Sequence, residues 1–342
     1  MGHLRTPMCT EVRGGLPVNS PAPQTTDTNL PTASTESAAA LASALRGSSS
    51  RHRSERLIET ALAACALISI LTTVGIIFVL LGEALQFFFD VSPIAFITRT
   101  KWTALFKHGS FGVLPLVAGT MFISALAMVI AIPLGLMAAI YLSEYASFRA
   151  RSILKPMLEL LAGIPTIVYG YFALTFITPE LLQRLSSETK PYNVLAGAIA
   201  VGVMVLPMVA SLSEDAIRAV PKSLREAAYG VGATKFETST RVVLPAALSG
   251  IVAAIILAIS RAIGETMIVA LATGSRAQLT TDPRQPMQAM TGYIVQVLSG
   301  DVVQGTTVYY SLFAVGLLLF CITLIMNIIS TFIVARFREE YQ

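Results

Sequence analysis

Six long apolar stretches, separated by short polar segments, follow one another along the chain from residue 57 onward. A helix of about 20 apolar residues crosses a hydrocarbon core of about 30 Å, and backbone groups in lipid must satisfy their hydrogen bonds internally. We therefore expect an all-α fold, a polytopic membrane protein. Transmembrane helices are predicted at residues 57–81, 114–142, 157–179, 194–214, 243–273 and 307–335. Three of these stretches are interrupted by proline, at Pro133, Pro165 and Pro207.

Composition agrees with a membrane protein. Of the 342 residues, 54% are hydrophobic and 13% are charged, whereas soluble domains carry about 25% charged residues. Residues 1–50 differ from the rest because they are rich in Ser, Thr, Pro, Ala and Gly. We expect a disordered cytoplasmic tail over 1–50, followed by a six-helix domain over 51–342.

The distribution of basic residues predicts the orientation. With the N-terminus inside, the inner segments carry thirteen Lys and Arg residues, and the outer segments carry seven. The inner residues lie within 51–56, 149–155, 218–241 and 336–338, and the outer ones within 99–107, 184–190 and 276–284. The positive-inside rule then places both termini in the cytoplasm. Trp102, next to Lys101, is expected to anchor the outer interface.

The sequence offers no pattern for metal, disulfide or nucleotide chemistry. Its three cysteines and three histidines lie far apart, and it contains no Gly-Lys dipeptide and hence no G-x-x-x-x-G-K-[ST] phosphate loop. The basic residues are spread over short loops, which argues against a nucleic-acid partner. We expect a non-enzymatic protein without a cofactor, and any use of ATP would require a separate ATPase.

The segment PKSLREAAYGVGATKFETSTRVVLP, residues 221–245, is too polar to cross lipid. Pro221 suits a first helical turn, and Gly230 and Gly232 can end that helix because glycine adopts the left-handed conformation of a C-cap. Residues 234–237, T-K-F-E, match a capping box that starts a second helix. The pattern predicts a helix, a glycine turn and another helix.

This segment resembles the EAA motif of ABC importer permeases. Glu226, Ala227 and Ala228 are followed after three residues by Gly232, and after nine more by V-V-L-P at 242–245, with Val in place of the usual Ile. The resemblance implies a type I importer fold in which 215–245 is a cytoplasmic coupling loop. It also implies that Glu226, Ala227, Ala228 and Gly232 seat in a groove of a cytoplasmic ATPase. An ordinary amphipathic loop is the alternative.

One arginine and one glutamate interrupt the apolar run AAIILAISRAIGETMIVALATG, residues 253–274. A charge near the bilayer centre costs about 2.5–3.5 kcal/mol on insertion scales, so Arg261 and Glu265 need a compensating environment. Four residues apart on one helix, they share a face that we expect to line the bundle interior or an aqueous path. They either form a structural bridge or bind an oxyanion. In the second case Glu265 would accept the O–H of phosphate and repel sulfate, which has none.

The stretches SRAIGETM, KPMLELLAGIPTIVYG (155–170) and GVLPLVAGT (112–120) resemble the phosphate-specific ABC importer permeases, most of all the PstC type. The resemblance covers residues 57–338 and implies a subunit that passes inorganic phosphate across the prokaryotic cytoplasmic membrane, with Arg261 and Glu265 on the phosphate path. Implied partners are a PstA-type permease, an ATPase dimer and an extracytoplasmic phosphate-binding protein.

Several alternatives stay open. The chain could be the PstA-type subunit, or a permease for sulfate, molybdate or phosphonate. An ion-coupled secondary transporter, with Arg261 and Glu265 as a proton relay, is disfavoured by the EAA segment.

Overall fold

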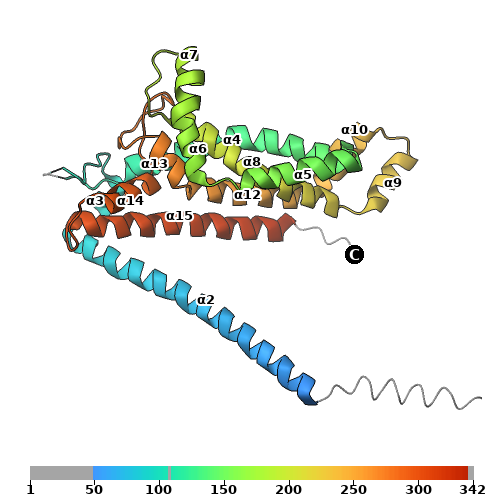
Figure 1. Cartoon of the computed structure of the whole chain (residues 1–342), viewed down its shortest axis with the longest axis horizontal. Coiled ribbons are helices and arrows are strands. Elements are labelled where there is room, and N and C mark those ends of the chain that lie inside the picture. Colours follow the sequence, from blue (N-terminus) through green and yellow to red (C-terminus); the bar gives the residue numbers. More distant parts are fainter. Residues whose placement is uncertain (1–48, 107–108, 338–342) are drawn as a thin grey trace, which may run out of the picture. The chain divides into compact units, whose positions relative to one another are not determined.

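The computed structural model describes residues 49–106 and 109–337, which are mostly helical (Figure 1). In chain order the helices, with three π-helical segments labelled η, are α2 (Ser49–Asp90), α3 (Pro93–Thr98), α4 (Leu114–Ile140), η1 (Tyr141–Tyr145), α5 (Phe148–Ala162), α6 (Thr166–Phe172), η2 (Ala173–Leu182), α7 (Gln183–Leu185), α8 (Val194–Ala219), α9 (Lys222–Gly230), α10 (Lys235–Thr238), η3 (Ser239–Val243), α11 (Leu244–Ala246), α12 (Leu248–Ile263), α13 (Met267–Ala272), α14 (Met290–Ser299) and α15 (Thr307–Phe337). The tail predicted over 1–50 lies outside the described residues apart from its last two, which begin α2.

The predicted spans fall on helices of the expected length and polarity, but two are not continuous. Four unbroken spans cover Glu55–Asp90, Leu114–Tyr145, Val194–Ala219 and Thr307–Ile333, and two bent pairs of helices bring the number to six if each pair counts as one. Four of the six predictions are thus confirmed as single helices. The predicted continuous helices at 157–179 and 243–273 are wrong.

The first broken span bends by 85° between α5 and α6. Pro165 lies in this break, at the N-cap of α6, where its missing N–H and its steric effect on the preceding residue end a helix. Pro133 and Pro207 do not interrupt their helices, which continue through both positions. The second pair bends by 69° at Ala247, and the helix ends again at Ile263, before α13.

The core forms around the pair α4 and α8, which approach closely because both present small residues. A Cβ added at Gly135 of α4 would lie 2.7 Å from Val209 Cγ1, and one at Gly202 of α8 would lie 3.0 Å from the carbonyl oxygen of Ala127. Close backbone approach of this kind is how membrane helices associate where burial from water gives little drive. Helix α12 packs against α8, α4 and α15 (Figure 1).

Trp102 is buried in an aromatic cluster, so the predicted interfacial anchor is wrong. Its ring centroid lies 4.8 Å from that of Tyr293 and 5.8 Å from that of Phe111, in edge-to-face contacts. Burial also raises the pKa of Tyr293 to about 12, while its hydroxyl bonds to that of Ser311 at 2.6 Å. The indole contributes to packing between α14 and the segment after α3 instead of facing headgroups.

The segment 221–245 folds as predicted, as a helix, a glycine turn and another helix. Pro221 is the N-cap of α9, one position before the helix that it was expected to open. Gly232 has φ of 86°, the left-handed conformation that favours glycine. The capping box is present: the Glu237 backbone N–H donates to Thr234 Oγ1 (3.3 Å), and the Thr234 N–H donates to Glu237 Oε2 (3.0 Å). Helices α9 and α10 lie at one end of the bundle, away from α13 and α14 (Figure 1).

Candidate functional site

Arg261 lies in the last turn of α12 and borders a cavity of about 350 Å³. Its side chain is 44% exposed. The cavity lies against α5 and α8, and its polar lining consists of Lys155, Glu159, Ser211, Glu214 and Arg261. The structure therefore puts the guanidinium at an open space between helices.

Glu265 lies beyond the end of α12, in the three-residue break before α13. Its side chain is 2% exposed. Its Oε1 accepts the backbone N–H groups of Met267 (3.1 Å) and Ile268 (3.4 Å), the first residues of α13. A carboxylate at this position satisfies N–H groups that have no partner within the helix. The backbone N–H groups at the start of α13, which the break leaves without partners in the helix, therefore stabilise the buried charge of Glu265.

Arg261 and Glu265 are brought together, although not on one continuous helix as expected. Arg261 Nη2 lies 3.6 Å from Glu265 Oε2, an ion pair across the break. Oε2 accepts no hydrogen bond from the described residues. The capping role of Glu265 was missed in the sequence, where Gly264 directly before it in an apolar run was the available signal.

The four residues of the EAA motif are divided between two faces of α9 and its turn. Glu226, Ala227 and Gly232 are exposed, while Ala228 is buried. Two large apolar side chains, Val231 and Phe236, are also exposed beside them. This corner of the molecule therefore exposes one acidic side chain, Glu226, beside two large apolar ones.

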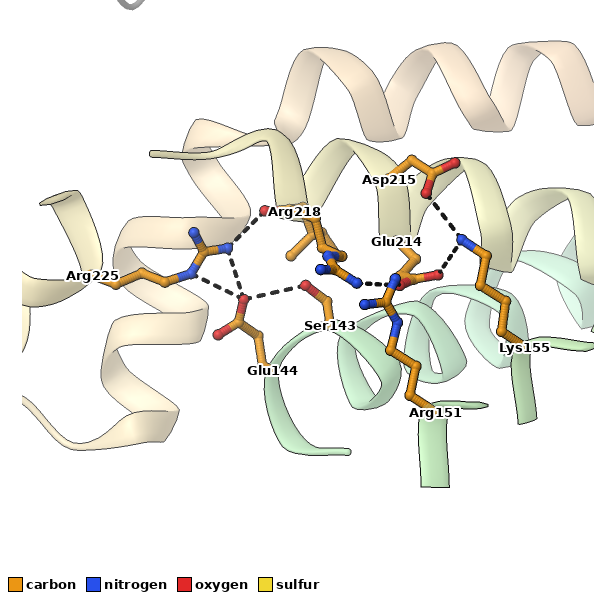
Figure 2. Close-up of polar contacts among 9 residues, drawn as sticks. Ser143, Glu144, Arg151, Lys155, Glu214, Asp215, Arg218 and Arg225 are labelled. Carbon is orange, nitrogen blue, oxygen red and sulfur yellow. Dashed lines mark hydrogen bonds and ion pairs between the residues drawn. The ribbon is translucent and has the colours of Figure 1, made fainter. Parts of the chain in front are cut away.

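Arg225, the residue before the exposed Glu226, attaches α9 to the bundle (Figure 2). Its Nη2 and Nε lie 3.0 Å and 3.3 Å from Glu144 Oε1 in η1, which continues α4. The guanidinium also donates to the carbonyls of Ile217 (2.8 Å) and Val220 (2.5 Å) at the end of α8. Charge-assisted bonds of this kind are the stronger ones in proteins. They connect α9 to two core helices.

A second charge cluster surrounds Glu214 of α8, whose side chain is fully buried (Figure 2). Glu214 pairs with Arg151 (2.5 Å), Lys155 (3.2 Å) and Arg218 (3.6 Å). Lys155 Nζ also lies 3.3 Å from Asp215 Oδ1. In the sequence analysis these three basic residues served only to predict the orientation, and their pairing with Glu214 was missed. The carboxylates that end the fourth apolar stretch were the signal for the pairing.

Another cavity, of about 720 Å³, lies at the end of the bundle opposite α9 and contains none of the predicted site residues. Lys190, Arg276 and Gln288 are among its lining residues, together with Trp102 and Tyr293. Two separate spaces thus lie toward opposite ends of the helices. Among the described residues there is no group of three or more His, Cys, Asp or Glu side chains arranged to hold a metal.

Comparison with known proteins gives consistent matches. Residues 131–339 match the family described as binding-protein-dependent transport system inner membrane component. The chain is 36% identical over 283 residues to the probable ABC transporter permease protein YqgH of Bacillus subtilis (strain 168), covering 82% of this chain and 90% of the relative. It is 33% identical over 260 residues to the phosphate transport system permease protein PstC of Mesorhizobium japonicum, covering 71% of this chain and 78% of the relative.

A solved structure shares the fold. It is that of a bacterial ABC transporter involved in the import of the acidic polysaccharide alginate, with a TM-score of 0.56 at 16% identity over 83% of this chain and 100% of that chain. At this identity the likeness concerns the helical arrangement alone.

Proposed function

The chain belongs to the family of inner membrane components of binding-protein-dependent transport systems, and from this membership we propose that it is the PstC-type subunit through which an ATP-driven importer passes inorganic phosphate. Permeases of this family are transport subunits and not catalytic ones. The observation that carries the phosphate proposal is the pair of Arg261, open to a cavity, and Glu265, buried beside it.

The chemistry of this pair suits a protonated oxyanion. The planar guanidinium of Arg261 binds two oxygens of a tetrahedral anion at once. Glu265 Oε2 accepts no hydrogen bond from the described residues. It is buried and does not line the cavity, so in this proposal the carboxylate accepts the O–H that phosphate carries near neutral pH only once the break between α12 and α13 opens toward the anion. Sulfate has no such proton and would meet a bare carboxylate. The 33% sequence identity to a relative named as a phosphate transport system permease also supports phosphate as the substrate.

We place the ATPase at the α9 corner. There, Glu226, Ala227 and Gly232 are exposed beside apolar Val231 and Phe236, while Arg225 attaches the helix to the bundle through Glu144. Movement of an ATPase dimer bound at this corner would be transmitted through α9 to α4 and α8. The assembly we propose also contains a PstA-type permease and an extracytoplasmic phosphate-binding protein, with both termini of this chain in the cytoplasm.

Uptake competition tests this function. Cells that lack their own phosphate importers would express the chain with its partner subunits, and entry of radiolabelled phosphate would be measured against excess arsenate, sulfate, molybdate or phosphonate. We expect strong competition by arsenate and none by sulfate, with uptake abolished by an inactive ATPase. If excess sulfate or molybdate inhibits the uptake of labelled phosphate, the proposed substrate would change from phosphate to another oxyanion. Uptake that survives loss of the ATPase but ends with the proton gradient would contradict an ATP-driven importer.

A further inference from the structure

The cavity that borders Arg261 extends along α8 toward the end of the bundle where α9 lies. Its lining on α8 begins at Met204 and ends at Glu214. These residues are ten positions apart, which corresponds to about 15 Å along an α-helix. Arg261 lies on the α12 side of this space, where its neighbour Ala262 belongs to the same core cluster as Met204 and Val205. Lys155 of α5 lies beside Glu214 at the far end. The cavity therefore has one cation near each end.

Both cations have a buried carboxylate as a partner, and Lys155 has a second, exposed partner in Asp215, 3.3 Å away. Arg261 faces the buried Glu265, and Lys155 faces the buried Glu214. In each case other groups also hold the carboxylate: two backbone N–H groups for Glu265, and Arg151 and Arg218 for Glu214. A cation can therefore turn to an incoming anion without leaving its carboxylate unpaired in the interior, which is the costly outcome.

We propose that Lys155 is a second anion-binding residue of the permeation path, which receives the oxyanion from Arg261 on the inward side. This inference rests on the proposed function and adds a residue to it. Lysine suits an exit position because its ammonium is a compact point charge and lacks the bidentate grip of arginine. Passage through a pore requires sites that are several and individually weak. Ser211 supplies a hydroxyl on the wall between them, whereas Glu159, exposed at the lining, repels an anion from the α5 side.

The competing explanation is that Lys155 only neutralises Glu214. Arg151 provides a matched control because it lies one turn earlier on α5 and pairs with the same carboxylate, yet does not line the cavity. Replacing either residue by glutamine removes one positive charge and leaves Glu214 with two cations. The two variants differ in whether the lost charge faces the path, and Lys155→Gln also removes the pair with Asp215, whose side chain is exposed to solvent.

The test uses the complete importer reconstituted in vesicles, with uptake normalised to the amount of assembled complex. We expect Lys155→Gln to lower the maximal rate of phosphate uptake about tenfold, the loss of roughly one charge-assisted hydrogen bond, while Arg151→Gln stays within about twofold of wild type. Equal losses in both variants, or none in Lys155→Gln, would overturn the role of Lys155. A wild-type importer that carries no phosphate would instead contradict the proposed function.

A chemical rescue keeps the test decisive if Lys155→Gln assembles poorly. Lys155→Cys would be made in a chain whose Cys9, Cys65 and Cys321 are replaced by serine, and treated before reconstitution with a thiol reagent that attaches either an aminoethyl or a sulfonatoethyl group. The first restores an ammonium at the position and the second adds an anion. We expect uptake to recover with the aminoethyl group only. Equal recovery with both, or with neither in an assembled complex, would refute the proposal.

Discussion

Removing the Arg225 guanidinium should release α9 from the bundle. Loss of one partner of a buried ion pair costs about 3–5 kcal/mol. The side chains here are 16% exposed for Arg225 and 6% for Glu144, and Ser143 Oγ remains 3.4 Å from the Glu144 carboxylate. The cost should therefore lie near the lower end, about 3 kcal/mol for Arg225→Gln. This corresponds to about a hundredfold increase in the population in which α9 is detached.

Hydrogen exchange of the α9 backbone amides in the assembled permease measures this population directly. We expect exchange over 222–230 to accelerate about a hundredfold in Arg225→Gln, and uptake driven by ATP to fall with it. The control is Lys222→Gln, which removes a charge from an exposed side chain of the same helix.

A double-mutant cycle separates the pair from its surroundings. Glu144→Gln combined with Arg225→Gln should cost less than the sum of the single changes, because no unpaired charge remains. Exchange at the wild-type rate in Arg225→Gln, or strict additivity in the cycle, would refute the assignment of the pair as the attachment of α9.

Four further variants test the other assignments. Arg261→Gln should abolish phosphate uptake while the ATPase copurifies normally, and uptake at the wild-type rate would make the arginine structural. Glu226→Lys or Gly232→Trp should weaken ATPase docking without removing the chain from the membrane, since the first reverses a charge at the exposed corner and the second forces a side chain into φ of 86°; a normal ATPase complement in purified complexes would contradict this. Gly202→Leu should lower the yield of folded chain, because even its Cβ would lie 3.0 Å from the Ala127 carbonyl oxygen; an unchanged melting temperature would show that α4 and α8 can separate at low cost.

Sequence predicted the parts of this fold that depend on local properties. Apolar length locates the spans, and the capping box of Thr234 and Glu237 with Gly232 fixes the turn after α9. Hydropathy does not reveal the bend, because the residues next to Pro165 on both sides are predominantly apolar. The signal for the bend is the G-I-P sequence before α6, because a proline disfavours the helical conformation of the residue that precedes it.

The charge clusters were beyond reach for a different reason. Arg225 and Glu144 are 81 residues apart in the sequence, which is farther than any single helix or turn reaches. Whether they meet depends on how α4, α8 and α9 pack, and one sequence does not encode that in any local pattern. The same holds for Lys155 and Glu214, whose approach joins α5 to α8.

The break after α12 changes how the two intramembrane charges depend on each other. On a continuous helix each would depend on the other, since the backbone N–H groups would be occupied within the helix. In the structure, Glu265 receives two N–H groups of α13, so its charge remains stabilised when Arg261 turns away. Arg261 is in turn the more exposed partner, at the edge of the cavity. Under the proposed function, the guanidinium would exchange the Glu265 carboxylate for a passing oxyanion. This asymmetry is why Arg261→Gln is expected to remove transport while sparing assembly.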